Sequence, residues 1–490
     1  MSLYDDAVAK LADLAGIAAS YIDAAGARVE TPSEVRRAVL HGLGIEVDTE
    51  VQAREALARL ERRRASPLSP FCVVSTGLIA RVPWFGPEVP DAIDFVLTDE
   101  TGGAREGRGR IQSDRSGRHL VLPALPTGYW QLRVASGAAS CESLLISAPP
   151  RCYEPASVTR GARRWGVTTQ VYSLRSPHNF GIGGYRDLFD LADGAAELGA
   201  DFLGLNPVHA LFTADLTKIS PYAPSSRRFL DAQLLDPTQL PRFAESGAPA
   251  LLEKTEPQAS IAALRDAVLV DRAGSWRAKL PLLEAVWDVS RGDDNRDFAE
   301  FRVAAGQSLM MHATFEALSE HFAAAGASWV GEWPDAFRHA ESEAVKQFAA
   351  SQSDRIAFHA WLQWQADHQL GAAHHAARKA GMGIGLFRDL AVGVDPAGSD
   401  IWSNPTHFAT GLSIGAPPDL LGPDGQNWGL PPFDPLEMER TGLSAFREMV
   451  AANMRHAGAI RIDHAFQLRR LYLVPQGAPA TDGAPTCWAA

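Results

Sequence analysis

Three titratable side chains stand together at the end of an apolar run. They are Arg461, Asp463 and His464, within the string GAIRIDHAF that covers residues 458–466. Positions two apart in a β-strand share a face, so Arg461 and Asp463 would point to the same side of a strand here. A neighbouring guanidinium favours the ionised form of a carboxylate, and an ionised carboxylate can attack an anomeric carbon to form a covalent glycosyl intermediate. The alternative is an ion pair with a structural role only, and the spacing alone leaves both open.

The segments before this string predict a parallel sheet that would position its charges. A buried strand at 165–174, an amphipathic helix at 184–200 and a second strand at 201–208 form a βαβ unit. Two later strands are predicted at 381–394 and 457–466. Polar residues follow this pattern, with Asn206 and His209 at the end of the second strand and Asp389 in the third. The carboxyl ends of the strands carry the chemistry in a closed parallel barrel, so we expect these side chains at one site.

Outside this region the hydrophobic period changes. Residues 1–64 have the pattern of amphipathic helices, with Thr31 predicted as an N-cap just before a proline. Residues 71–150 hold short runs of Val, Leu, Ile and aromatic residues between turn residues, which is typical of a small β-sandwich. Residues 160–490 form the predicted α/β region, which is interrupted by a helical insertion at about 255–380.

The composition excludes several classes of function. The chain has 490 residues and a formal net charge of −12, without a basic stretch of the kind that binds nucleic acid or an anionic membrane surface. No apolar run is long enough to span a bilayer, and Asp5 and Asp6 stand where a signal peptide needs positive charge. The four cysteines lack metal-ligand spacing, so we expect reduced thiols, a cytoplasmic location and no metal site.

Six strings, in the order in which they occur, resemble the 4-α-glucanotransferase family, whose members are also called amylomaltases or disproportionating enzymes. RIDH at 461–464 resembles the nucleophile strand of the wider α-amylase clan, and the longer strings narrow the resemblance. They are WGVTTQVYSLRSPHNFGIGGYRDL (165–188), GADFLGLNPVHALF (199–212), SPYAPSSRRF (220–229), RDLAVGVDPAGSDIW (388–402), GAPPDLLGPDGQNWGLPPFD (415–434) and RIDHAFQLRRLYLVPQGAPATDGA (461–484). The helical and β-rich N-terminus is similar to the longer bacterial branch of this family.

This resemblance implies the transfer of α-1,4-glucan segments between maltooligosaccharides, with retention of configuration and without a cofactor. It implies that Asp463 is the nucleophile and Arg461 its positioning partner. The expected substrate contacts, taken from the family's motifs and from the polar strand ends, are Tyr222, Asn206, His209, Asp389, Trp402, Asp419, Gln426, Trp428 and His464. Trp402 and Trp428 could instead be core aromatics, and Asp419, after two prolines, could be a plain turn residue or helix cap.

One part of the family's pattern has no counterpart that we find in this sequence. A retaining enzyme needs a second carboxyl group as general acid and base, and the family supplies a Glu after its fifth barrel strand and an Asp after its seventh. Only four barrel strands are predicted before Ala490. We therefore expect an incomplete (β/α)8 TIM-type barrel with helical insertions, in a truncated glucanotransferase with negligible activity. The alternatives are a catalytically dead glucan-binding remnant and an α-glucan hydrolase of the same clan.

Overall fold

The computed structural model describes residues 3–86, 92–136, 139–155, 158, 163–293 and 295–487. Its N-terminal part consists of helices and one short hairpin: α1 (Leu3–Leu14), β1 (Ser20–Ile22), β2 (Arg28–Glu30), α2 (Ser33–Gly42) and α3 (Glu50–Arg64). The N-cap predicted at Thr31 is wrong, because Pro32 occupies that position and the Thr31 hydroxyl donates to the Ala18 carbonyl oxygen at 2.7 Å. A capping box is present instead at Thr49, whose side chain accepts from the Gln52 amide.

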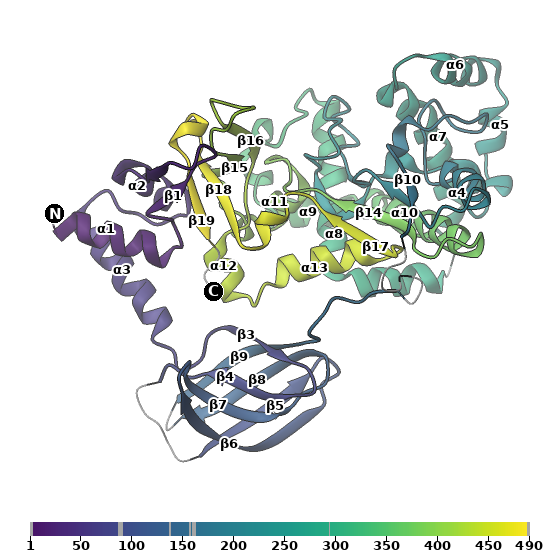
Figure 1. Cartoon of the computed structure of the whole chain (residues 1–490). Helices are drawn as coiled ribbons and strands as arrows, with labels where there is room; N and C mark the ends of the chain where they lie inside the picture. Colours follow the sequence, from purple (N-terminus) through teal and green to yellow (C-terminus); the bar gives the residue numbers. More distant parts are fainter. Residues whose placement is uncertain are drawn as a thin grey trace.

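Seven strands between residues 71 and 148 form one sheet with the order β3-β9-β8-β5-β6-β7-β4. The strands are β3 (Phe71–Ser75), β4 (Ile79–Pro83), β5 (Ile93–Asp99), β6 (Ala104–Asp114), β7 (Gly117–Ala124), β8 (Gly128–Ser136) and β9 (Ala139–Ala148). Leu97, Leu120, Leu132 and Leu145 are almost fully buried in a hydrophobic core formed within this segment. Figure 1 shows these strands as a separate lobe below the rest of the chain.

The predicted parallel sheet is confirmed, with the strand order β10-β11-β14-β17. Its strands are β10 (Gly166–Thr169), β11 (Phe202–Leu205), β14 (Gly385–Leu390) and β17 (Ala459–Ile462). The helix α4 (Asp187–Glu197) connects β10 to β11, as the βαβ pattern predicts. These are the four barrel strands predicted from the sequence, and the incompleteness of the barrel stays a prediction.

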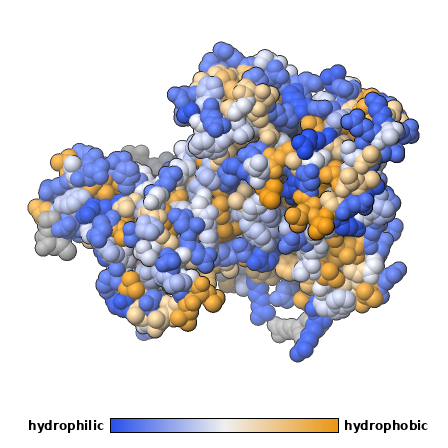
Figure 2. Space-filling model, turned by 90° about the horizontal axis from the view of Figure 1, so that it is seen from above, coloured by the Kyte–Doolittle hydropathy of each residue, from blue (hydrophilic) through white to orange (hydrophobic). Residues whose placement is uncertain are grey.

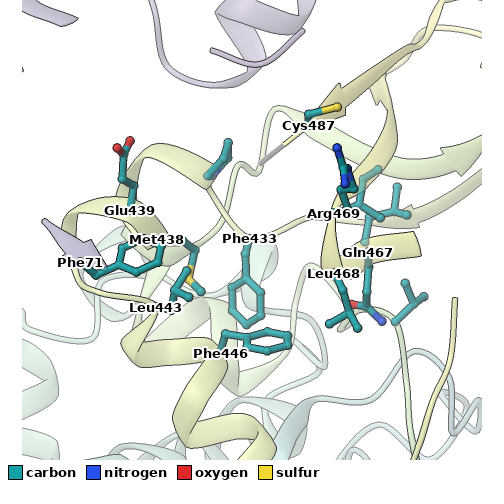
Figure 3. A pocket seen from close by; sticks show the side chains of 14 residues that line it. Phe71, Phe433, Met438, Glu439, Leu443, Phe446, Gln467, Leu468, Arg469 and Cys487 are labelled. Carbon is teal, nitrogen blue, oxygen red and sulfur yellow. The ribbon is translucent and has the colours of Figure 1, made fainter. Parts of the chain in front are cut away.

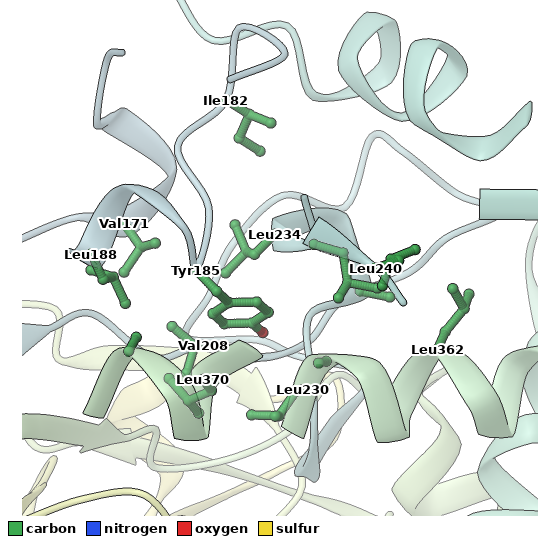
Figure 4. Packing of buried hydrophobic residues seen from close by; sticks show 14 of the residues in the cluster. Val171, Ile182, Tyr185, Leu188, Val208, Leu230, Leu234, Leu240, Leu362 and Leu370 are labelled. Carbon is green, nitrogen blue, oxygen red and sulfur yellow. The ribbon is translucent and has the colours of Figure 1, made fainter. Parts of the chain in front are cut away.

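The largest hydrophobic core lies beside this sheet. It contains Leu203 of β11, Leu188 of α4 and Leu370 of α10 (Ser353–Lys379), all fully buried. Tyr185 is buried among them, and its hydroxyl donates to the Asp231 carbonyl oxygen at 3.0 Å. Figure 4 shows the Tyr185 ring surrounded by leucine and valine side chains above the α10 helix. This packing fixes the sheet against the helical insertion.

The insertion predicted at about 255–380 is helical. It contains α6 (Thr255–Asp266), α7 (Arg272–Ser290), α8 (Arg296–Ala324), α9 (Glu343–Ser351) and α10, and α5 (Ala248–Leu252) precedes it. Two short strands, β12 (His209–Ala210) and β13 (Ser226–Leu230), pair antiparallel before it. In the part of the chain that the structure describes, no helix combines the length and the apolarity needed to cross a membrane.

A second, antiparallel sheet joins the last part of the chain to the N-terminal helices. Its order is β16-β15-β18-β19, with β15 (Leu412–Ala416), β16 (Gln426–Leu430), β18 (Arg470–Pro475) and β19 (Ala484–Cys487). The helix α11 (Ser399–Ser403) precedes β15 in the sequence, and α12 (Pro435–Arg440) and α13 (Ser444–Met454) lie between β16 and β18. Apolar residues of β15 and β18 share one core with α1, α2 and α3, and Ile17 bridges to Thr486.

Candidate active site

Arg461 joins two carboxylates at the carboxyl ends of neighbouring strands. Its Nη1 donates to both Asp389 oxygens at 2.6 Å, and its Nη2 donates to Asp463 Oδ1 at 2.7 Å. The side chain of Asp389 is 5% exposed, that of Asp463 is 28% exposed and that of Arg461 is 50% exposed. The hydrogen bonds to Asp389 raise the pKa of the Arg461 guanidinium, so it stays charged between one buried and one accessible carboxylate.

The backbone of β14 and β17 sets this arrangement. The two strands pair in parallel with Asp389 opposite Arg461, and the Asp463 amide donates to the Leu390 carbonyl oxygen at 3.0 Å. His464 has a φ of 48°, a left-handed conformation that turns the chain away from the strand directly after Asp463. Gln467 then donates to the Asp463 carbonyl oxygen at 2.6 Å. The two-residue strand period therefore placed Arg461 and Asp463 correctly on one side.

A polar cavity of about 410 Å³ opens beside this charged group. Tyr222, Asn206, Asp389 and Arg461 line it, and the Tyr222 hydroxyl donates to Asp389 Oδ2 at 3.0 Å. Burial and the neighbouring Asp389 raise the pKa of Tyr222, so its phenol remains a donor. Asp463 does not line the cavity itself and is connected to it through Arg461.

Asn206 shapes the cavity wall with both ends of its amide engaged. Its Oδ1 accepts from the Val171 amide at 2.8 Å and its Nδ2 donates to the Pro207 carbonyl oxygen at 2.8 Å. Two further lining residues, Gln170 and Tyr172, are not among the expected contacts, although Tyr172 is a polar residue at the end of the first predicted strand; the Tyr172 hydroxyl donates to Gln170 Oε1. Both lie just after β10, and polar side chains in the otherwise apolar string WGVTTQVYSL were the signal that could have identified them.

Two predicted contacts are wrong because their side chains are buried elsewhere. Trp402 is 5% exposed and packs against Phe315 and Trp333, while its Nε1 donates to the Phe337 carbonyl oxygen at 2.9 Å. It is therefore a core aromatic. His209 is 1% exposed, and its Nε2 accepts from the Ala391 amide at 3.2 Å. Burial, reinforced by two nearby arginines, holds the pKa of His209 well below its usual value, so the imidazole is neutral.

A third predicted contact, Asp419, belongs to a turn. Its Oδ1 accepts from the backbone amides of Leu421 and Gly422 at 2.8 and 2.6 Å, within the exposed loop between β15 and β16. The turn alternative considered for this residue is the one that the structure supports.

Gln426, Trp428 and His464 form a group on the other side of Asp463. Trp428 Nε1 donates to Gln426 Oε1 at 2.9 Å, and its ring meets that of His464 edge to face with centroids 5.1 Å apart. Burial lowers the pKa of His464. None of the three lines the 410 Å³ cavity. The remaining predicted residues thus form two groups next to Asp463: Arg461 connects it to Asp389, Tyr222 and Asn206 at the cavity, and His464 connects it to Trp428 and Gln426 of β16.

A larger cavity of about 590 Å³ is lined mainly by apolar side chains. Figure 3 shows Phe433, Met438, Leu443 and Phe446 on one of its sides, with Leu468 facing them. Figure 2 shows hydrophilic residues over most of one face of the molecule, with hydrophobic residues in small groups between them. In the described residues, His41, Glu46 and Asp48 are the one group whose potential metal-ligand atoms lie close together, and all three are exposed.

Charged side chains at the carboxyl ends of parallel strands, beside a cavity, are the arrangement in which barrel enzymes carry their active sites. Comparison with known families agrees with this class. Residues 169–486 match the family described as 4-alpha-glucanotransferase, and residues 67–149 match the MalQ N-terminal beta sandwich domain. The chain belongs to the 4-alpha-glucanotransferase family.

Individual relatives carry the same name. The chain is 37% identical to a 4-alpha-glucanotransferase of Haemophilus influenzae, over 74% of this chain and 54% of that protein. It is 34% identical to the 4-alpha-glucanotransferase of Mycobacterium tuberculosis, over 97% of this chain and 67% of the relative. It thus spans between about half and two thirds of the length of these relatives. The truncation predicted from the sequence is not borne out by the comparisons.

Solved structures give the same result for the fold. The crystal structure of amylomaltase from Corynebacterium glutamicum superimposes with a TM-score of 0.81 at 30% identity, covering 99% of this chain and 68% of that one. An amylomaltase from Streptococcus agalactiae, solved in complex with acarbose, superimposes with a TM-score of 0.55 at 22% identity, covering 66% of this chain and 64% of that one. The fold predicted from the sequence, a TIM-type α/β fold after a β-sandwich, is confirmed at this level.

Proposed function

We propose that this chain carries the donor side of a 4-α-glucanotransferase site, with Asp463 as nucleophile. The observation that carries the proposal is the Arg461 guanidinium, which bonds Asp463 and Asp389 at the edge of a polar cavity. An ionised, partly exposed carboxylate held by a cation is what nucleophilic attack on a sugar requires. The family to which the chain belongs supports the same reaction class.

The proposed reaction is a double displacement. An Asp463 oxygen attacks the anomeric carbon of an α-1,4-linked glucose, the bond to the leaving 4-oxygen breaks, and that oxygen takes up a proton. The 4-hydroxyl of a second sugar then attacks the glycosyl ester and loses its proton, which releases Asp463 and restores the α configuration. Since Arg461 uses Asp463 Oδ1, we assign the attack to Oδ2.

The cavity residues suit a neutral polyhydroxylated ligand. Tyr222 offers a partly exposed aromatic face, and Asp389 and Asn206 offer carboxylate and amide groups to sugar hydroxyls. Acarbose, the ligand of the Streptococcus agalactiae amylomaltase, is a suitable probe for this cavity. We propose α-1,4-glucans and maltooligosaccharides as the substrates.

A second candidate is glucan binding without turnover by the 490-residue chain. It is favoured by the cavity lining, which within the described residues contains Asp389 as its carboxylate and no glutamate. A reaction that lacks its general acid is typically slower by about 10²–10⁴-fold. Binding through the same cavity would not require that group.

Incubation of the purified chain with maltotriose distinguishes the candidates. A glucanotransferase yields glucose together with longer maltodextrins, and Asp463→Asn abolishes both products. A hydrolase yields reducing sugar without longer chains. Binding of maltotriose or acarbose by the wild type and by Asp463→Asn, without product from either, supports the second candidate. Absence of both binding and turnover would refute the proposal.

The chemical step can be isolated with α-maltosyl fluoride as donor. Fluoride leaves without being protonated, so the first displacement does not need a general acid. If the second displacement is unassisted, the glycosyl ester accumulates and is visible as a covalent adduct by intact-protein mass spectrometry; if it is assisted, the same first displacement is followed as release of fluoride. We call this reaction labelling, and its rate reports the nucleophile alone.

A further inference from the structure

Two buried polar side chains lie close to the chain that follows β14 and do not line the cavity. His209 on β12 is 1% exposed and Arg227 on β13 is 2% exposed, and neither lines the 410 Å³ space. The antiparallel pairing of β12 with β13 places these side chains on adjacent strands. Both side chains are therefore placed away from the cavity surface.

Both side chains bond the backbone that immediately follows Asp389. The Ala391 amide donates to His209 Nε2 at 3.2 Å. Arg227 Nη1 donates to the carbonyl oxygens of Ala391 and Val392 at 3.2 and 2.7 Å. We call this arrangement of His209 and Arg227 around residues 391–392 the backbone clamp.

The backbone clamp is one residue away from the peptide group that holds Asp463. The Leu390 carbonyl oxygen, directly before Ala391, accepts from the Asp463 amide at 3.0 Å. Asp389, directly before Leu390, bonds Arg461, and Arg461 in turn bonds the Asp463 side chain. Displacement of residues 390–392 would thus move Asp463 through its main chain and through its side chain.

Burial of the Arg227 guanidinium costs more free energy than a purely structural role would require. Within the described residues this guanidinium forms no salt bridge; the buried Asp400 carboxylate, which accepts from the Arg227 backbone amide at 3.0 Å, raises the pKa of the guanidinium only in part against the effect of burial. The guanidinium lies over the Phe433 ring at 4.9 Å, and Arg227 Nε is buried without a hydrogen-bond partner. Desolvating a cation without a paired carboxylate is unfavourable, and an apolar side chain of similar volume is often the more stable choice in a core. What the arginine adds here is a donor directed at the 391–392 carbonyls.

We propose that Arg227 and His209 are positioning residues, which fix the end of β14 and thereby the geometry of attack by Asp463. This inference rests on the nucleophilic role proposed above for Asp463. Neither residue touches substrate in the proposal, and both act through the main chain of residues 390–392.

Two pairs of variants of the full chain test the backbone clamp. Arg227→Met removes both hydrogen bonds that Nη1 donates to the carbonyl oxygens, and Arg227→Lys keeps a cation that can still reach one of them. His209→Leu removes the acceptor for the Ala391 amide, and His209→Gln restores an acceptor of similar reach. Lys279→Met is the matched control. Lys279 lies in the helical insertion and is also a buried cation, 2% exposed, and its Nζ donates to the Gln233 carbonyl oxygen at 2.8 Å. Thermal melts confirm that each variant is folded.

The first readout is the labelling rate at saturating α-maltosyl fluoride. Misplacement of a reacting group can reduce a rate by about 100-fold, so we expect losses of about 10–100-fold for Arg227→Met and His209→Leu. The conservative variants should recover at least a third of the wild-type rate, and Lys279→Met should label normally even if it melts at a lower temperature. A residue with a structural role only would change melting and leave the labelling rate of the folded protein unaltered.

The second readout does not depend on catalysis. Amide hydrogen exchange at Ala391 and Asp463 should accelerate at least 10-fold in Arg227→Met and not in Lys279→Met. Unchanged exchange, or unchanged labelling in both Arg227→Met and His209→Leu, would overturn the inference. If the wild-type chain neither accumulates the label nor releases fluoride, the proposed function of Asp463 fails, and the exchange data still decide whether the backbone clamp holds residues 390–392.

Discussion

Replacement of Arg461 by methionine tests the charged group at the strand ends most severely. The change removes three hydrogen bonds of 2.6–2.7 Å to carboxylates and leaves Asp389, whose side chain is 5% exposed, with the Tyr222 hydroxyl as its remaining described side-chain partner. Methionine is similar in length to the arginine stem, so the loss is chiefly of charge and hydrogen bonds. We expect both the stability of the site and the rate of labelling to fall.

The magnitude follows from the exposure of each partner. A hydrogen bond to a charged group contributes about 1.5–3 kcal/mol, and the lower value applies to Asp463 because Arg461 is half exposed and water partly replaces it. Breaking a fully buried ion pair costs about 3–5 kcal/mol, and the half-exposed guanidinium reduces that to about 2–3 kcal/mol for Asp389. The loss at Asp463 alone corresponds to about 10-fold in labelling rate, and the displaced Asp389 extends it to about 100-fold.

The assay compares labelling by α-maltosyl fluoride in three variants. Arg461→Met should label about 100-fold more slowly than the wild type. Arg461→Lys should lie between the two, because one ammonium group cannot bond both carboxylates as the planar guanidinium does. Arg470→Met is the matched control, since Arg470 is an exposed arginine of the next strand that lies over the Phe466 ring at 5.8 Å. Labelling of Arg461→Met within threefold of the wild-type rate would refute the reasoning.

Three further predictions address single contacts. Tyr222→Phe keeps the aromatic face but loses the 3.0 Å bond to Asp389, so acarbose affinity measured by calorimetry should fall about 5-fold, and an unchanged affinity would remove Tyr222 from the site. Trp402→Phe loses the 2.9 Å bond to the Phe337 carbonyl oxygen, which should lower the free energy of unfolding by about 1–2 kcal/mol without altering acarbose affinity. Burial raises the pKa of Glu316 from 4.5 to about 7, so the folded state holds that proton more tightly and stability is lost as pH rises from about 4.5 to about 7. Glu316→Gln should therefore stabilise the helical region by about 3 kcal/mol at pH 8 and by nothing below pH 4.5 in denaturant unfolding, and parallel pH curves for the two proteins would contradict this.

The parallel sheet and the charged group were predictable because they depend on local rules. Alternation along β17 puts Arg461 and Asp463 on one side, and parallel pairing brings Asp389 of β14 opposite Arg461. Family strings then assigned the roles. These inferences need only the chain direction and the two-residue period of a strand.

The contacts that failed depend on segments distant in the sequence. Trp402 is enclosed by Phe315 and Trp333, which belong to the helical insertion. The sequence near residue 402 does not predict these two contacts. His209 follows a strand end as a ligand-binding residue would, but β13 and Ala391 close over it. The predicted cap at Thr31 failed for the same reason, because the Ala18 carbonyl oxygen accepts its hydroxyl proton. Local propensity is overridden wherever tertiary contacts compete for the same side chain.

The most direct test of the central claim is the location of the covalent label. The 490-residue chain is incubated with α-maltosyl fluoride, digested at low pH to preserve the ester, and mapped by tandem mass spectrometry. A maltosyl group on Asp463, absent from Asp463→Asn and prevented from forming when acarbose is added before the fluoride, is the result predicted here. A label on Asp389 or on any other carboxylate, with Asp463 unmodified, would contradict the assignment of the nucleophile.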